Sequence, residues 1–471
     1  MARALAAGVD SSTQSTKVVV CDADTGEIVR STRVAHPDGT EIHPDRWWEA
    51  FQLATDGGCL EGVSALAVGG QQHGMCLLDD KGQIVRPALL WNDTRSGQAA
   101  YDLVVELGGV AAWADAVGVV PVASITISKL RWLAEHEPEQ AARTNDVVLP
   151  HDWLTGQILR HGNGFETWTT DRGDASGTGY WSARSGKYRI DLIDLALGRL
   201  VGTPRVLPPS GRAGVTDTGM VVAAGTGDNM AAALGLGLVP GDVVVSLGTS
   251  GTVFAEHTSP VRDVTGAVAG FASARGGHLP LACTLNAARV LTATAQMLGT
   301  DLAGLDRLAL DADAGAGGLS LLPYLDGERT PNLPDAAGTL GGLTRTNATP
   351  ENIARAAVEG MLCNLVAGMA SLKSLGVAAE RVLLIGGAAR SSAVSAIAPT
   401  LFGTTVAIPS PAEYVAIGAA RQAVWALRGD EAPPEWAVRI ETTAEPSGEA
   451  SVPAAEIIGR YTELLRTMHG L

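Results

Sequence analysis

The stretch GVDSSTQSTKVVVCD, Gly8–Asp22, decides the fold. It places a lone carboxylate, Asp10, ahead of a run of small hydroxylated and amide residues, and the apolar run Val18–Val20 follows. An ordinary hairpin turn needs only two residues, such as Asn-Gly. The longer polar turn predicts a β-hairpin that binds an anion, because consecutive backbone N–H groups in a turn form an anion-binding concavity.

A related stretch, GDVVVSLGTSGTVFAE, begins the second half of the chain at Gly241–Glu256. It again has the pattern of a strand, a turn of Gly, Ser and Thr, and a second strand. Two hairpins resemble each other by chance about as often as by duplication, so these stretches alone leave both origins open. The chain organisation predicted is a first domain over 1–240, a second over 241–428, and a C-terminal extension over 429–471 that ends in a helix.

Alternation of strand-like and helical runs over most of the chain predicts an α/β fold. The buried-type strand Val63–Val68 and the helices expected at Ser128–Glu137, Thr349–Leu375 and Glu413–Leu427 are examples. The Gly- and Pro-rich section 315–346 is expected at the surface.

Composition excludes some classes of function. Lys and Arg number 34 and Asp and Glu 50 in 471 residues, for a net charge of −16. Such acidity argues against electrostatic binding to nucleic acid or to an anionic membrane. The five cysteines have no CxxC spacing, which is typical of reduced thiols in a cytoplasmic protein. No run of about 18 apolar residues is evident, so no membrane span is expected.

The usual nucleotide-binding signatures, GxxxxGK[ST] and a complete GxGxxG, are absent. A nucleotide would therefore have to be bound by the hairpin turns. The first turn supplies Ser12 and Thr13, and the second supplies Gly248 and Thr249. Two such turns facing each other across a cleft would surround a triphosphate, and Asp10 could hold Mg²⁺ through water, since that ion prefers oxygen ligands and keeps its hydration shell.

The stretch VAAGTGDNMAAALGLG, Val222–Gly237, places Asp228 and Asn229 at the head of an alanine-rich helix. An Asp in this position is favoured by helix capping alone. The glycines before it also permit a ligand to approach the backbone, which is typical of an active-site carboxylate.

Hydrogen-bonding side chains also follow the strand Val63–Val68. Gln72 and His73 lie past its end, where open α/β sheets bind ligands, and they suit a polyhydroxylated molecule. A histidine that merely satisfies structural hydrogen bonds is the alternative. Trp91 begins the stretch WNDTRS, in which an ordinary ion pair between Asp93 and Arg95 is the alternative to a binding role.

Two extended motifs carry a family resemblance. SITISKLRWLAEH, Ser124–His136, and GTLGGLTRTNATPENIARAAVE, Gly338–Glu359, resemble the two diagnostic stretches of the FGGY carbohydrate kinases, members of the actin-like ATPase superfamily. The resemblance covers nearly the whole chain. It implies an α/β fold with two actin-like (ribonuclease H-like) domains and a nucleotide cleft between them, ATP and Mg²⁺ as cofactors, and a possible homodimer.

The resemblance also implies roles for individual residues. Asp228 would be the catalytic base, and the sugar would contact Gln72, His73, Trp91, Asp228 and Asn229. The nucleotide would contact the first phosphate loop (Asp10, Ser12, Thr13, Lys17), the second phosphate loop (Gly248, Thr249) and an adenosine loop (Gly386, Gly387, Arg390).

Within the family, the QQHG, WNDTRS and GTGDN stretches are similar to the branch that phosphorylates D-xylulose at O5. Three departures from the family pattern are Ser12, where many members have Gly, Gln72, where some have Met, and Ala388, where a third Gly is common. The Gln72 departure leaves another ketose or polyol, such as ribulose, an alditol or glycerol, as an alternative substrate. A non-catalytic actin-like nucleotide-binding module is a further alternative, though the sugar-site residues argue against it. A sugar-binding regulator is disfavoured because no helix-turn-helix segment or basic face accompanies these motifs.

Overall fold

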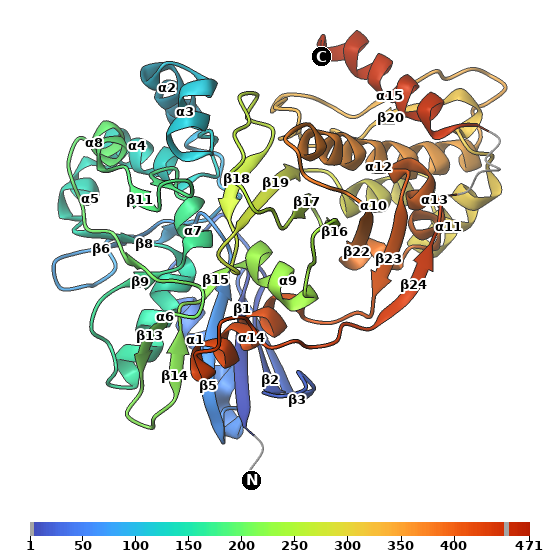
Figure 1. Cartoon of the computed structure of the whole chain (residues 1–471). Coiled ribbons are helices and arrows are strands. Elements are labelled where there is room, and N and C mark those ends of the chain that lie inside the picture. Colours follow the sequence, from blue (N-terminus) through green and yellow to red (C-terminus); the bar gives the residue numbers. More distant parts are fainter. Residues whose placement is uncertain (1–3, 447–451) are drawn as a thin grey trace. The chain divides into compact units, whose positions relative to one another are not determined.

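The computed structural model describes residues 4–446 and 452–471. The chain forms two compact units, whose elements are labelled in Figure 1. The first contains the chain up to Leu238 together with Glu256–Leu279 and Ala412–Ala437. The second contains Val239–Ala255, Pro280–Pro411 and the chain from Val438 onward. Each unit therefore includes segments that are distant in sequence.

A mixed seven-stranded sheet forms the centre of the first unit. Its order is β13-β14-β5-β1-β2-β3, and β15 pairs with β5. Strands β1 and β2 are the antiparallel arms of the first hairpin, whereas β5 runs parallel to β1. The strands are β1 (Leu5–Ser11), β2 (Ser15–Asp22), β3 (Ile28–Ala35), β5 (Val63–Gly70), β13 (Arg212–Val215), β14 (Val221–Ala223) and β15 (Thr226–Gly227).

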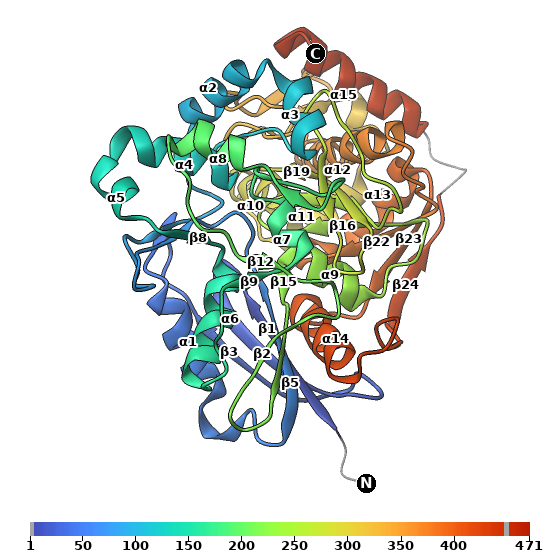
Figure 2. The ribbon, with the colours of Figure 1, turned by 60° about the vertical axis from the view of Figure 1, so that its left-hand side comes forward.

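The central strands β1, β2 and β5 are buried on both faces, and side chains that alternate along each strand enter two different clusters. In β1, Val9 packs in the cluster that includes Trp47 of α1 (Asp45–Thr55) and Trp153 of α6 (Pro150–His161). The neighbouring Ala6 packs in a second cluster with the alanines of α14 (Tyr414–Arg428). Figure 2 shows α1 and α6 on one side of these strands and α14 on the other. Burial on two faces explains the apolar runs within these strands, such as Val18–Cys21 of β2 and Ala65–Val68 of β5.

Glycines bring α14 against the sheet and against α9 (Asp228–Leu236). A Cβ on Gly8 would lie 1.8 Å from the carbonyl oxygen of Ala416, and a Cβ on Gly418 would lie 1.8 Å from that of Ala231. Helix α14 thus packs backbone to backbone on β1 and α9. The alanine- and glycine-rich composition of this region is a packing requirement.

The second unit repeats the arrangement of the first hairpin and its parallel neighbour. Strands β16 (Asp242–Leu247) and β17 (Gly251–Ala255) are antiparallel, and β22 (Arg381–Ile385) runs parallel to β16. The full sheet order is β18-β19-β17-β16-β22-β23-β24, in which β18 (Ala269–Ala272) and the start of β19 are part of the first unit. The remaining strands are β19 (His278–Thr284), β23 (Thr405–Pro409) and β24 (Ile440–Ala444), and the helices are α10 (Ala288–Met297), α11 (Leu302–Asp311), α12 (Pro350–Ser374), α13 (Ser392–Phe402) and α15 (Ala454–His469).

The predicted α/β class and the duplicated architecture are confirmed by these two sheets. The helix expected at Ser128–Glu137 is α4 (Thr126–His136), and α12 and α14 match their expected ranges closely. The surface expectation for the section 315–346 is wrong in part, because Tyr324 and Glu328 are buried there.

One described helix, α12, is long and apolar enough to cross a membrane by length and composition. No such segment was expected from the apolar pattern of the sequence. Most of its apolar window, 72%, is buried inside the protein, which is also the property of a core helix. Helix α12 packs on α11, α13 and β17 of the second unit.

The substitution Gly8→Ala is expected to destabilise the first unit by about 3 kcal/mol or more, because a methyl group cannot enter the contact with Ala416 without moving α14. Gly459→Ala is the control: a Cβ on this exposed glycine of α15 would have no atom within 4 Å, and alanine favours helix by about 1 kcal/mol. Urea unfolding of both variants checks the difference. Equal stability of Gly8→Ala and the wild type would contradict the packing.

Candidate active site

Three parallel strand ends assemble the site in the first unit. In the register of the sheet, Asp10 of β1 lies beside Gly69 of β5, and Thr226 of β15 lies beside Gly69 on the other side. One residue further, Gly227 pairs with Gly70, and Asp228 follows as the first residue of α9. The topology therefore brings the two predicted carboxylates, Asp10 and Asp228, to the same end of the sheet on opposite sides of β5.

Asp228 is partly exposed and is not the helix cap. The N-cap position of α9 belongs to Gly227, and Asp228 Oδ1 instead accepts hydrogen bonds from the backbone N–H and the side-chain amide of Asn229, at 2.8 and 2.9 Å. Desolvation by surrounding protein atoms, with the nearby charge of Asp10, raises the pKa of Asp228 to about 7. A carboxyl with such a pKa can accept and release a proton near neutral pH. The capping alternative raised by the sequence is thus set aside.

Asp10 is buried and held by two side chains. Its Oδ1 accepts a hydrogen bond from the Ser12 hydroxyl, and its Oδ2 accepts one from Lys17 Nζ at 3.1 Å. The same ammonium contacts Glu413 Oε2 at 2.6 Å, just before α14 begins. Burial raises the pKa of Asp10, while Lys17 and Ser12 act in the opposite direction. Lys17 therefore lies between two carboxylates, and Ser12 fills the place of the family's glycine with a hydrogen-bond donor to Asp10.

Two residues predicted to bind the sugar, Gln72 and Asn229, are in direct contact. Asn229 Nδ2 donates to Gln72 Oε1 at 3.1 Å, so the two amides are linked directly. Gly227 makes this contact possible, because a Cβ there would lie 2.7 Å from Gln72 Cγ. The structure thus joins Gln72 to the Asp228–Asn229 pair, which the sequence could only place in separate loops.

His73 has an unusual backbone conformation. Its φ is +67°, in the left-handed region, and its carbonyl accepts hydrogen bonds from Thr126 Oγ1 and from the buried Lys129 Nζ. Its ring Nδ1 lies 2.7 Å from the carbonyl oxygen of Gly177. A non-glycine residue in this conformation is costly, and such strain is concentrated at functional sites. The structural hydrogen bonds expected of an ordinary histidine are present, and they hold a strained residue beside Gln72.

Trp91 contacts the turn that is predicted to bind phosphate. Its indole Nε1 donates to Thr13 Oγ1 at 2.7 Å, which joins a predicted sugar residue to a predicted nucleotide residue. The ion pair proposed as the alternative for this stretch also exists, since Arg95 Nε lies 2.9 Å from Asp93 Oδ1. The ion pair between Asp93 and Arg95 and a binding role for Trp91 can therefore exist together in this stretch.

The predicted residues of the second unit form two adjoining loops. Gly248 and Thr249 occupy the turn between β16 and β17, and their carbonyls accept hydrogen bonds from the first turn of α10. Gly386 has φ +93°, and a Cβ there would lie 2.6 Å from the backbone of Leu247. Gly386, Gly387 and Arg390 are exposed beside this close approach. The two loops predicted to contact phosphate and adenosine thus lie side by side within this unit.

Several residues near the site were missed by the sequence analysis. Glu413 is 396 residues from Lys17 in the chain, and no local signal marks it. Thr226 donates to Asp171, which lies near His151 and Asp174 in a buried polar cluster. One sequence signal could have indicated this buried cluster. The stretch TTDRGDASGT contains Asp171 and Asp174, and neither has a basic residue at helical spacing.

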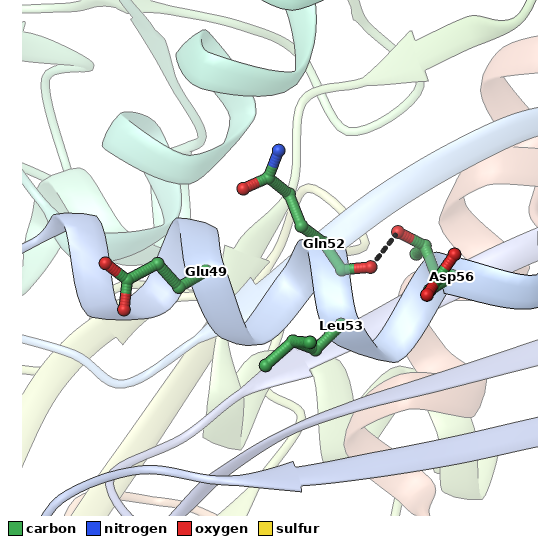
Figure 3. Close-up of a pocket in the computed structure, with 5 residues that line it drawn as sticks. Glu49, Gln52, Leu53 and Asp56 are labelled. Atoms are coloured by element: carbon green, nitrogen blue, oxygen red, sulfur yellow. Dashed lines mark hydrogen bonds between the residues drawn. The ribbon is translucent and has the colours of Figure 1, made fainter.

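A pocket on the outside of α1 is unrelated to these residues. It is lined by Glu49, Gln52, Leu53, Thr55 and Asp56 (Figure 3). None of the predicted site residues lines it, so it carries no functional assignment.

Comparison with known proteins decides the family. The FGGY carbohydrate kinase N-terminal domain matches residues 5–235, and the C-terminal domain of the same family matches residues 243–427. This chain belongs to the FGGY family of carbohydrate kinases. The expected fold of two actin-like domains is confirmed with it, and ATP is the phosphoryl donor that this kinase family implies.

Individual FGGY kinases resemble the whole chain. A protein of Streptomyces rubiginosus named xylulose kinase is 45% identical over 98% of this chain and 96% of its own length. The crystal structure of xylulose kinase from Bifidobacterium adolescentis has a TM-score of 0.90 at 43% identity and covers 98% of this chain and 100% of its own. The crystal structure of Plasmodium falciparum glycerol kinase with ADP, at 16% identity, has a TM-score of 0.85 and covers 99% of this chain and 98% of its own. That last similarity concerns the fold alone.

The raised pKa of Asp228 predicts a pH-dependent cost in stability. Between the ordinary pKa of 3.8 and the folded value of about 7, the unfolded carboxyl loses its proton while the folded one keeps it. Rising pH through this interval therefore destabilises the fold, and the full cost is present above it. Asp228→Asn cannot ionise, so we expect it to be more stable than the wild type at pH 8, with a smaller advantage at pH 5.

Thermal or urea unfolding at the two pH values measures this difference. Asp194→Asn, at an exposed position on α8 (Ile190–Leu197), is the matched control for removing a carboxylate, and the effect of Asp228→Asn is measured relative to it. An advantage of Asp228→Asn that is the same at pH 5 and pH 8 would contradict the raised pKa.

Proposed function

We propose that this FGGY kinase transfers the γ-phosphoryl group of ATP to the O5 hydroxyl of D-xylulose, forming D-xylulose 5-phosphate and ADP. The observation that carries the substrate is the 45% identity, over nearly the full length of both chains, to a relative named xylulose kinase. The arrangement of Asp10, Gln72, Asp228 and Asn229 around the strand ends of the first unit supports the chemistry.

Asp228 is the proposed general base. An alcohol is a poor nucleophile while it keeps its proton. As the sugar oxygen forms its bond to the γ-phosphorus, the bond from phosphorus to the bridging oxygen breaks, ADP leaves with that electron pair, and the hydroxyl proton passes to Asp228. A base with a pKa near 7 is suited to this transfer, which contributes about 10²–10⁴ in rate.

Asn229 holds the base in its reactive orientation. Its backbone N–H and side-chain amide both bond Asp228 Oδ1, which leaves the other carboxylate oxygen for the hydroxyl proton. The Gln72 amide, fixed by Asn229, and the clamped His73 are the groups we assign to the other hydroxyls of the sugar. Their chemistry suits a polyol, because each can donate or accept a hydrogen bond.

Asp10 fits the Mg²⁺ that accompanies ATP. Both of its oxygens already accept hydrogen bonds, from Ser12 and Lys17, which suits contact through the ion's water shell better than direct ligation. The bound ion would neutralise charge on the phosphates. Ser12, Thr13 and Lys17 of the first unit, and the loops of the second unit at Gly248–Thr249 and Gly386–Arg390, are the proposed nucleotide contacts.

A panel of acceptors tests the substrate. With ATP and Mg²⁺, coupled ADP-release assays are run with D-xylulose, D-ribulose, an alditol and glycerol, and ³¹P NMR identifies the product. We expect D-xylulose to give the highest kcat/KM and a phosphomonoester at O5. A preference for another ketose or polyol would show that this acceptor, and not D-xylulose, is the substrate. If no acceptor accelerates ADP release, the non-catalytic nucleotide-binding alternative is favoured.

A further inference from the structure

A buried histidine lies beneath both halves of the sugar site. His151 has no exposed surface and is the second residue of α6. A Cβ on Gly70 would lie 2.8 Å from the His151 Cβ, and a Cβ on Gly225 would lie 2.5 Å from its ring Cδ2. Gly70 leads into the Gln72 segment, and Gly225 leads into Asp228. The histidine is thus packed between the backbones that carry the sugar residues and the base.

His151 pairs with two buried carboxylates. Its Nδ1 lies 2.5 Å from Asp174 Oδ2, and its Nε2 lies 3.3 Å from Asp152 Oδ1. Burial alone would lower the pKa of His151, but the charges of Asp152 and Asp174 outweigh it and raise the pKa to about 10. The two carboxylates thus favour the protonated ring, and the three residues form a buried ion-pair cluster.

The network continues to the segment before Asp228. Asp171 caps the short helix α7 (Arg172–Ser176), accepting hydrogen bonds from the backbone N–H groups of Gly173 at 2.7 Å and Asp174 at 2.8 Å. Its Oδ2 also accepts one from Thr226 Oγ1 at 2.7 Å. A helix cap requires only the two hydrogen bonds from the backbone. The third hydrogen bond links Asp171 to Thr226, a fully buried residue that lies two positions before Asp228.

We propose that Thr226, through Asp171 and the His151–Asp174 ion pair, is a positioning residue for the catalytic carboxylate of Asp228. This inference rests on the proposed function, in which Asp228 is the base. The chain of contacts ties the Thr226–Gly227 backbone to α6 and α7, while the same histidine supports Gly70. The base and the sugar residues are thereby held in one fixed relation.

Thr226→Val tests the inference, because it removes the hydroxyl and keeps the shape of the side chain. We expect kcat for D-xylulose to fall about tenfold or more, since misplacing a catalytic group by about 1 Å costs up to 10²-fold. The KM for ATP should change less than about twofold. Thr226→Ser retains the hydroxyl and should restore most of the lost kcat, and Thr226→Ala serves in place of valine should the latter not fold.

Thr155→Val is the matched control, a fully buried threonine of α6 whose hydroxyl has no hydrogen-bond partner among the residues that the structure describes. It should keep the wild-type kcat. Asp228→Asn, measured alongside, distinguishes a failure of the proposed base from a failure of the positioning role. Wild-type turnover in Asp228→Asn would overturn the proposed base, whereas an inactive Asp228→Asn with full kcat in Thr226→Val would overturn the positioning role alone.

Discussion

Desolvation of the Asp228 carboxyl, strengthened by the nearby charge of Asp10, is the constraint on which this site depends. Asp10 and Asp228 are brought to one end of the sheet by the strand register, and the charge of Asp10 adds to desolvation in keeping a proton on Asp228. Lys17 and Ser12 bond Asp10 and act to keep it ionised despite its burial. The two residues are thereby suited to different roles: Asp10 is bonded to an ammonium and a hydroxyl, and Asp228 exchanges a proton near pH 7.

The scaffold fixes the position of these groups by omitting side chains where helices approach the sheet. Gly69 of β5 pairs with Asp10, and a Cβ there would lie 2.9 Å from Val415 of α14 and 3.2 Å from Ala231 of α9. Gly8 brings α14 into backbone contact with β1, and Gly418 brings it into backbone contact with α9. Because α9 begins with Asp228 and α14 follows directly after Glu413, the packing that stabilises the unit also sets the position of the site.

Local signals in the sequence predicted much of this arrangement. Both hairpins, the main helices and the loops with Asp10, Gln72 and Asp228 follow from turn chemistry and periodicity within short windows. The contact of Lys17 with Glu413 and the link from Thr226 to His151 could not be predicted in that way, because each depends on how distant segments pack. The burial of Tyr324 within a Gly- and Pro-rich section was missed for the same reason. The proposed cytoplasmic location and homodimer stay predictions.

Chemical rescue tests the role of Asp228 most directly. Asp228→Gly removes the carboxylate and leaves space for a small one, and single-turnover rates of phosphoryl transfer from ATP to D-xylulose can be followed as formate is added. The account predicts a very slow reaction without formate and a saturable increase with it, as an external carboxylate takes over the proton. A variant that transfers the phosphoryl group at the wild-type rate with no formate present would contradict the account.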